Sequence, residues 1–436
     1  MEKYQAILYA IMQIIEEDYA GQPECKLRNG GLKWLEACIS AQEEGMLDDE
    51  LFARYMTWYM AEFEDPNLSF EVSSEPSEKS GQRYTCGFSV RRFRDELQVV
   101  EVREDERFAL GDALVLLDGQ TPDEYLKSLP GNSVNGSDPE RQLWDGLVAC
   151  CSRVLVRHAD GSEEDRLLRR FPRASFVEAL RPPTVRVVEE AGDGSETAVV
   201  IAAHHFVDGS VLMAMQQHFA DIQRADRVII DVRDVSEGMI GNAYPLMALF
   251  FDREINLKNL MGQEFVYTRY GERNTHLRVR QLERILTRSD ESGKPWVQAE
   301  IDHVVACAGL GFVKEAEFEE EMLFPPSPKA QKTYLLTDVH TAGPAERLAA
   351  IAQRASEAGC GKVCRVGRAT RGGLDYSNLV AVALSEEFSL VYPISKTETA
   401  HEGHGMRGWG IAPDVYVAFT PSECTEDIVL HEALSR

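Results

Sequence analysis

The chain has 436 residues, of which 44% are hydrophobic and 27% are charged. This length allows two or three domains with substantial cores, and the composition is that of a globular protein. The 46 Lys and Arg residues are outnumbered by 72 Asp and Glu residues, which gives a formal net charge of −26. Because such a surface repels a phosphate backbone and anionic lipid, the charge argues against a nucleic-acid partner or docking on a membrane surface.

The first residues and the cysteines bear on location. Residues 1–19 carry apolar side chains broken by Gln13, Glu16 and Glu17, which is typical of an amphipathic helix and unlike an export signal. Nine irregularly spaced cysteines indicate reduced thiols. We therefore expect a cytoplasmic protein without a membrane span. Only Cys360 and Cys364 have a spacing that suits metal ligands, and without a second such pair the sequence predicts no metal and no cofactor.

The N-terminal third is predicted to contain helices and then short strands. Helical periodicity runs through residues 1–64, and a Ser-, Glu- and Pro-containing stretch at 73–82 reads as a loop. Alternating apolar residues then predict strands at 87–91, 96–102 and 113–117, followed by a helix at 122–129. A further helix at 140–151 and a strand pair at 154–157 and 166–170 complete this part.

From residue 184 the pattern changes to β-branched strands that alternate with helices. Such alternation favours an α/β layer fold with a mainly parallel sheet. The predicted strands lie at 197–203, 227–232, 333–337, 362–366 and 414–419, with a hairpin at 380–384 and 388–392. The predicted helices lie at 210–222, 242–251 and 344–358, and a last helix from Thr425 to Leu434 has Thr425 as its N-cap.

Four motifs follow one another in an informative order. Residues 110–119 read Leu-Gly-Asp-Ala-Leu-Val-Leu-Leu-Asp-Gly, and residues 228–233 read Val-Ile-Ile-Asp-Val-Arg. Residues 335–346 contain Thr-Ala-Gly-Pro-Ala-Glu, and residues 366–373 read Val-Gly-Arg-Ala-Thr-Arg-Gly-Gly, completed by Gly-Ile-Ala-Pro-Asp-Val at 410–415. Together they resemble the C-terminal-processing (tail-specific) serine peptidase family, whose wider group includes the tricorn core and the interphotoreceptor retinoid-binding repeats.

This resemblance implies a domain organisation. The expected parts are a helical N-terminal segment (1–72), a PDZ-like module that binds peptide ends (83–130), a connecting segment (131–183) and a crotonase-like α/β core (184–436). The overall fold class is therefore α/β, with an α+β mixture over the whole chain.

The resemblance also places the catalytic groups of this family on the chain. The family cleaves peptide bonds with a Ser nucleophile, a Lys or His base and backbone N–H groups that hold the oxyanion. The nucleophile position lies three residues before Glu346, which is Gly343. The Lys that follows Thr-x-Gly is replaced by Gly373, and the His position of the tricorn type falls on Ala202.

The resemblance places the oxyanion-hole region at Gly238 and Pro344. Asp234, Val235 and Glu237 stand where the family has Gly, Asn and Gly, and Asn67 stands in a usual His position. The residues that match the structural part of the family pattern are Asp231, Arg233, Glu346, Thr370, Gly372, Gly373 and Asp414.

We therefore expect a serine-type peptidase by family resemblance that lacks the catalytic residues and binds a peptide or protein chain end. Two alternatives stay open. An active peptidase would use Thr341 or a Cys as nucleophile, with His340, His204 or His205 as base. A metal-dependent hydrolase would use His204, His205, His401 and His404, although His401-Glu402-Gly403-His404 lacks the His-Glu-x-x-His spacing.

Overall fold

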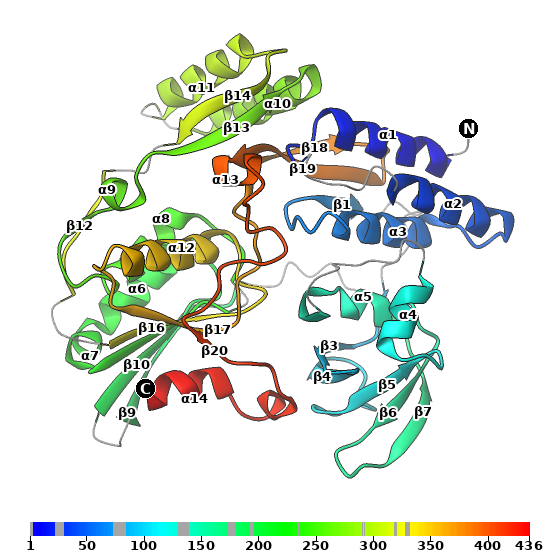
Figure 1. Ribbon diagram of the computed structural model, residues 1–436, viewed down its shortest axis with the longest axis horizontal. Coiled ribbons are helices and arrows are strands. Elements are labelled where there is room, and N and C mark those ends of the chain that lie inside the picture. Colours follow the sequence, from blue (N-terminus) through cyan, green and yellow to red (C-terminus); the bar gives the residue numbers. More distant parts are fainter. Residues whose placement is uncertain are drawn as a thin grey trace.

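The computed structural model describes residues 3–21, 30–72, 84–129, 139–172, 180–191, 196–233, 235–289, 291, 293–317, 321–327 and 332–436 (Figure 1). These residues form a mixed α/β fold with several sheets, as the sequence predicts. Within the described ranges, no helix is both long and apolar enough to cross a membrane.

The N-terminal part packs three helices against a sheet that also contains late segments of the chain. Its elements are α1 (Lys3–Glu17), α2 (Gly30–Glu43), α3 (Asp49–Ala61) and β1 (Ser69–Val72). The strand β1 pairs antiparallel with β19 (Phe388–Thr397), and the aromatic rings of Phe70 and Phe388 lie 5.2 Å apart at this junction. The helical segment therefore shares one hydrophobic core with the C-terminal half.

A second sheet is antiparallel and follows chain order. Its strands are β3 (Phe88–Phe93), β4 (Glu96–Val102), β5 (Ala113–Leu117), β6 (Arg153–Arg157) and β7 (Glu163–Leu167). The helices α4 (Pro122–Ser128) and α5 (Trp144–Val148), the 3-10 turn η1 (Pro139–Arg141) and the short pair β2 (Tyr84–Thr85) and β8 (Phe171–Pro172) accompany it. The sheet continues across residue 130, because β6 pairs with the second edge of β5.

The third sheet has six strands in the order β20-β17-β16-β11-β10-β9. The strands are β9 (Thr184–Ala191), β10 (Glu196–Ala202), β11 (Arg227–Asp231), β16 (Lys332–Thr337), β17 (Val363–Gly367) and β20 (Val415–Tyr416). Only β9 is antiparallel to its neighbour within this sheet. The helices around it are α6 (Ser210–Gln217), α7 (Phe219–Arg224), α8 (Ile240–Met247), α12 (Gly343–Glu357) and α14 (Ile428–Ser435).

Both faces of this sheet are covered, as Figure 1 shows with α8 and α12 on one side and α14 on the other. Successive side chains of a strand point to opposite faces, so neighbours enter different cores. Ile230 and Leu335 pack in the core that includes α8 and α12, whereas Ile229 and Leu336 pack in the core that includes α14. This packing holds the first turn of α12 at the carboxyl ends of the parallel strands.

Two helix predictions need correction. The helix predicted at 210–222 is broken at His218 into α6 and α7. The last helix begins at Ile428 and is capped by Asp427, whose carboxylate accepts a hydrogen bond from the backbone N–H of Leu430 at 3.0 Å. Thr425 is not the cap, because the preceding residues form the 3-10 turn η2 (Pro421–Cys424) and its hydroxyl donates to the carbonyl of Ser422.

The remaining elements lead from the left side of Figure 1, where β12 and α9 lie, to its top, where α10, α11, β13 and β14 lie. They are β12 (Ile255–Asn256), α9 (Leu257–Met261), β13 (Glu264–Tyr270), α10 (Glu272–Arg288), α11 (Lys294–Ala306), β14 (Gly311–Glu317) and β15 (Leu323–Phe324). β13 and β14 join the sheet of β1 and β19, to which β18 (Tyr376–Ala383) also belongs, and α13 (Glu398–His401) follows β19. The helices α10 and α11 pack on β13 through a small core of their own.

Candidate functional site

A cavity of about 1090 Å³ opens beside the first turns of α12. It exceeds the roughly 300–1,000 Å³ typical of small-molecule sites. Its walls come from α12, β13, the start of β18, α13 and the loop that follows β11. Among the described residues that line it are Ser236, Gly238, Gly343, Pro344, Arg347, Asp375, Tyr376, Ser377, Leu379, Thr397 and Thr399, and this lining contains no His, Lys or Cys.

Gly343, the expected nucleophile position, lies at the N-terminus of α12 and lines the cavity. Its φ of +54° is in the left-handed region, which L side chains rarely adopt. A Cβ at this position would lie 2.8 Å from the carbonyl oxygen of Ser236. The local backbone is therefore shaped around a residue without a side chain, and the cavity wall has no hydroxyl there.

The expected oxyanion region also lines the cavity. Gly238 has a φ of +119°, and a Cβ on it would lie 2.0 Å from the carbonyl carbon of Phe206. Glycine is thus required by the close approach of two backbone segments, which pair as a parallel bridge. Pro344 occupies the first turn of α12, and since proline has no backbone N–H it supplies no donor to an oxyanion.

Glu346 organises the loop opposite α12. Its fully buried carboxylate accepts hydrogen bonds from the Thr370 hydroxyl at 2.5 Å and from the backbone N–H groups of Gly372 and Gly373 at 2.6 and 2.8 Å. The Thr370 hydroxyl oxygen in turn accepts from the N–H of Ile411 at 2.8 Å. Burial holds the pKa of Glu346 above its ordinary value, and these hydrogen bonds offset only part of that rise. Three separate segments of the sequence, from the third and fourth motifs, therefore meet in one hydrogen-bonded junction.

Thr341 and His340 lie in the turn between β16 and α12 but do not line the cavity. The Thr341 hydroxyl is fully buried, donates to the carbonyl of Val232 at 3.2 Å and accepts from the N–H of Asp338 at 3.0 Å. Both directions of this hydroxyl are used by backbone groups of the turn. His340 is exposed, and its backbone N–H donates to the Asp338 carboxylate at 2.8 Å.

His204 and His205 follow β10 and also lie outside the cavity lining. The His205 Nδ1 accepts from the backbone N–H of Val207 at 3.2 Å, which fixes a local turn. Burial lowers the pKa of His204, and the nearby charge of Arg181 lowers it further. Neither imidazole is brought to a hydroxyl or thiol that faces the cavity.

Asp231 and Arg233 form an ion pair that reaches the C-terminal helix. Arg233 binds Asp231 through two hydrogen bonds of 2.9 and 2.7 Å, and it binds the helix cap Asp427 through two of 2.8 and 2.7 Å. Burial alone would lower the pKa of Arg233, but these carboxylates raise it. The pair fastens the end of β11 to α14, which is a structural contact away from the cavity lining.

Asp414 fastens the last strand in a similar way. Its carboxylate accepts from the Arg365 guanidinium at 2.6 and 3.1 Å and from the Arg365 backbone N–H at 2.8 Å. Burial would raise the pKa of Asp414, yet the contacts with Arg365 hold it below its ordinary value. Asp414 therefore ties the chain before β20 to β17.

Asn67, which replaces a usual His, connects the helical segment to the cavity. Its Nδ2 donates to the carbonyls of Gly373 and Tyr376 at 2.7 and 2.8 Å. Asp65, two residues earlier, is buried and accepts from the Tyr19 hydroxyl at 2.8 Å. Burial raises the pKa of Asp65 to about 6. An amide at position 67 therefore supplies hydrogen bonds where an imidazole would supply a proton acceptor.

Comparison with solved structures finds several of similar architecture. A complex of mature CPAF with lactacystin is 12% identical with a TM-score of 0.63, and the match covers 97% of this chain and 95% of the other. A point mutant of CPAF is 13% identical with a TM-score of 0.64, covering 97% and 94%. The photosystem II D1 C-terminal processing protease is 13% identical with a TM-score of 0.44, covering 100% and 98%.

The chain therefore has a fold similar to that of CPAF. No family model and no curated protein matches its sequence. At 12–13% identity the structural likeness speaks for the fold alone.

Within this fold, one group outside the cavity has the side chains of a metal site. His303, Cys307 and Glu315 are the only described residues that group their ligand atoms closely enough to hold an ion. The histidines of the hydrolase alternative do not form such a group in the described chain, and His401 instead stacks on Tyr267 with ring centroids 3.9 Å apart. Sequence reasoning missed this cluster, although the i, i+4 spacing of His303 and Cys307 was a usable signal.

Proposed function

We propose that this protein is a non-catalytic relative of the C-terminal-processing peptidases that binds an extended peptide or protein chain end in the cavity beside α12. The observation that carries the proposal is the wall at Gly343. A left-handed glycine stands at the nucleophile position, and no His, Lys or Cys is present among the described lining residues. The Ser–Lys and Ser–His pairs by which this family performs acyl transfer are therefore missing from the described lining.

An extended chain suits the cavity because a strand edge borders it. Among the described strands, β18 pairs with β19 alone, and its residues Ser377 and Leu379 line the cavity beyond the contact between Asn67 and Tyr376. Backbone groups on the second edge of a strand can pair with an added peptide strand. Leu379 is 39% exposed there and offers an apolar contact to a side chain of that peptide.

The proposal also assigns the two sheets that have not yet been given a role. We assign the β3–β7 sheet with α4 to a PDZ-like module and the six-stranded sheet with its helices to a crotonase-like core. The module then extends to the end of β7, beyond residue 130. The net charge of −26 favours partners with basic or unstructured chain ends.

Peptide binding can be measured by the fluorescence anisotropy of labelled, unstructured basic peptides with the purified full-length protein. We expect saturable binding that Leu379→Asp weakens by about 10-fold or more, since a buried apolar contact is worth about 1.5–3 kcal/mol. Leu323→Asp is the matched control, because Leu323 is 62% exposed on β15 and lies outside the cavity lining. Absence of saturable binding, or equal losses in both variants, would refute the proposal.

A further inference from the structure

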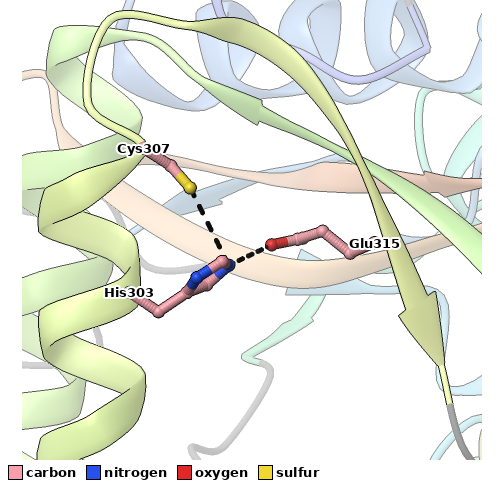
Figure 2. Close-up of side chains that lie close together, drawn as sticks. All are labelled: His303, Cys307 and Glu315. Atoms are coloured by element: carbon pink, nitrogen blue, oxygen red, sulfur yellow. Dashed lines mark hydrogen bonds and ion pairs between the residues drawn. The ribbon is translucent and has the colours of Figure 1, made fainter.

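The strongest cluster of metal-ligand side chains in the described chain lies on α11 and β14, apart from the cavity. Figure 2 shows His303 on α11, Cys307 at the residue that caps the C-terminus of α11, and Glu315 on the facing strand β14. The Cys307 Sγ lies 3.8 Å from the His303 Nε2, and the Glu315 Oε1 lies 2.5 Å from the same nitrogen. All three ligand atoms lie within 4.8 Å of one another.

Local structure brings these residues together. Residues four apart on a helix share a face, so His303 and Cys307 point the same way. The chain reverses tightly after α11, where Gly309 donates its N–H to the carbonyl of Tyr270 at 2.7 Å. Pairing of Val266 with Glu315 then fixes the register of β14 against β13, which sets Glu315 opposite the helix face.

A neighbouring residue orients the carboxylate. The hydroxyl of Tyr270 donates to Glu315 Oε1 at 2.8 Å, and the ring of Tyr270 meets the ring of His303 edge-on with centroids 6.1 Å apart. Tyr270 itself is buried in the small core under α10 and α11. Metal-binding carboxylates are commonly held by such an outer hydrogen bond.

We propose that His303, Cys307 and Glu315 form a binding site for a zinc ion, independent of the peptide-binding function. Imidazole, thiolate and carboxylate are the three donor types that Zn²⁺ accepts, and three protein ligands leave a fourth position for water. Mg²⁺ and Ca²⁺ do not suit this set of ligands, because they prefer to be bound by oxygen atoms alone. The site would fasten the end of α11 to β14.

The geometry needs only a small adjustment for this ion. Tetrahedral ligands at about 2.0–2.3 Å from zinc stand roughly 3.5 Å apart. The sulfur–nitrogen separation of 3.8 Å already fits, and the nitrogen–oxygen contact of 2.5 Å must open by roughly 1 Å. The His303 side chain is 48% exposed, so the ring can move and solvent can reach the fourth position.

Cobalt binding tests the proposal, because Co²⁺ replaces Zn²⁺ and a thiolate–cobalt bond gives a near-ultraviolet charge-transfer band. We expect the reduced full-length protein to bind one equivalent of Co²⁺ with this band, and Zn²⁺ to displace it. Cys307→Ser should abolish the band. Cys364→Ser is the matched control, because Cys364 is partly buried on β17 and should leave the band unchanged.

A second variant separates ligands from support. Tyr270→Phe keeps all three donors but removes the hydrogen bond to Glu315, and we expect the band to persist with affinity lowered about 10–100-fold. Circular dichroism of each variant checks the fold. Absence of the band in the wild type, its survival in Cys307→Ser, or its loss in Cys364→Ser would overturn the assignment.

Discussion

The cavity beside α12 and the cluster on α11 and β14 differ in what they offer a ligand. The cavity offers space, whereas the cluster offers side chains that can bind an ion. The cavity has volume and a strand edge, but its described lining holds no His, Lys or Cys. The cluster holds an imidazole, a thiol and a carboxylate, yet none of its members lines the cavity. Polar groups near the cavity, such as Glu346, are instead used up in holding backbone segments together.

This difference separates the residues of the family pattern, which hold backbone segments together, from a cluster whose side chains could bind an ion. The residues that match the pattern make an ion pair, a hydrogen-bonded junction or a close backbone approach. If a residue holds the fold together, its substitution should lower the free energy of unfolding. If the cavity is non-catalytic, placing a serine at the nucleophile position should not produce peptidase activity. The following variants separate these two kinds of effect.

The largest effect is expected for Glu346→Ala. The substitution leaves the Thr370 hydroxyl and the N–H groups of Gly372 and Gly373 without their buried acceptor, so we expect the free energy of unfolding to fall by about 4 kcal/mol. Glu357→Ala on the same helix removes an exposed ion pair with Arg354 and an exposed hydrogen bond from Gln353, and it should cost about 0.5 kcal/mol. Urea denaturation measures the free energy of unfolding of both variants. Similar losses in the two would show that the hydrogen-bonded junction at Glu346 does not stabilise the cavity wall.

Gly343→Ser restores a hydroxyl at the family position and should still give no peptidase activity. We expect a loss of about 3 kcal/mol, because the left-handed backbone and the carbonyl of Ser236 both oppose a side chain. Gly359→Ser shares a positive φ but has open space around it, so it should lose only about 1 kcal/mol. Cleavage of a fluorogenic peptide by Gly343→Ser would contradict the structural reading of this glycine.

A smaller, pH-dependent effect is expected at Asp65. Burial raises its pKa from 3.8 to about 6, so in this range the folded state binds more protons than the unfolded state, and the free energy of unfolding falls as pH rises. The contribution is about 2 kcal/mol between about pH 4 and pH 6. Denaturation of Asp65→Asn across this range should show a deficit relative to wild type that shrinks by that amount. For comparison, Asp95→Asn, whose side chain is 95% exposed, should run parallel to wild type.

Much of the six-stranded sheet could be predicted because both of its faces are buried. The predicted strands at 197–203, 227–232 and 333–337 correspond to β10, β11 and β16, whose residues are apolar and β-branched on both faces. The bounds of the strand predicted at 166–170 were wrong. The strand in that region is β7 (Glu163–Leu167), whose residues are mostly exposed and polar. Its register depends on pairing with β6, where Arg153 contacts Asp165, and no apolar pattern records that pairing.

The candidate site was predictable only where residues lie close along the chain or belong to a known pattern. The family pattern pointed to Gly343 and Glu346, and the same pattern pointed to Thr370, Gly372 and Gly373, which Glu346 contacts. Glu315 could not be connected to His303 from the sequence, because the turn after α11 and the β13–β14 register decide that contact. Asn67 was flagged as a departure, but its bonds to Gly373 and Tyr376 join segments distant in sequence.

The fate of a bound peptide tests the central claim most directly. Unstructured peptides that bind the wild-type protein would be incubated with it and then analysed by mass spectrometry. The account predicts that every peptide stays intact while binding remains saturable and sensitive to Leu379→Asp. Cleavage products that form in proportion to wild-type protein, and that Leu379→Asp reduces but Leu323→Asp does not, would show that the cavity is catalytic and would contradict the account.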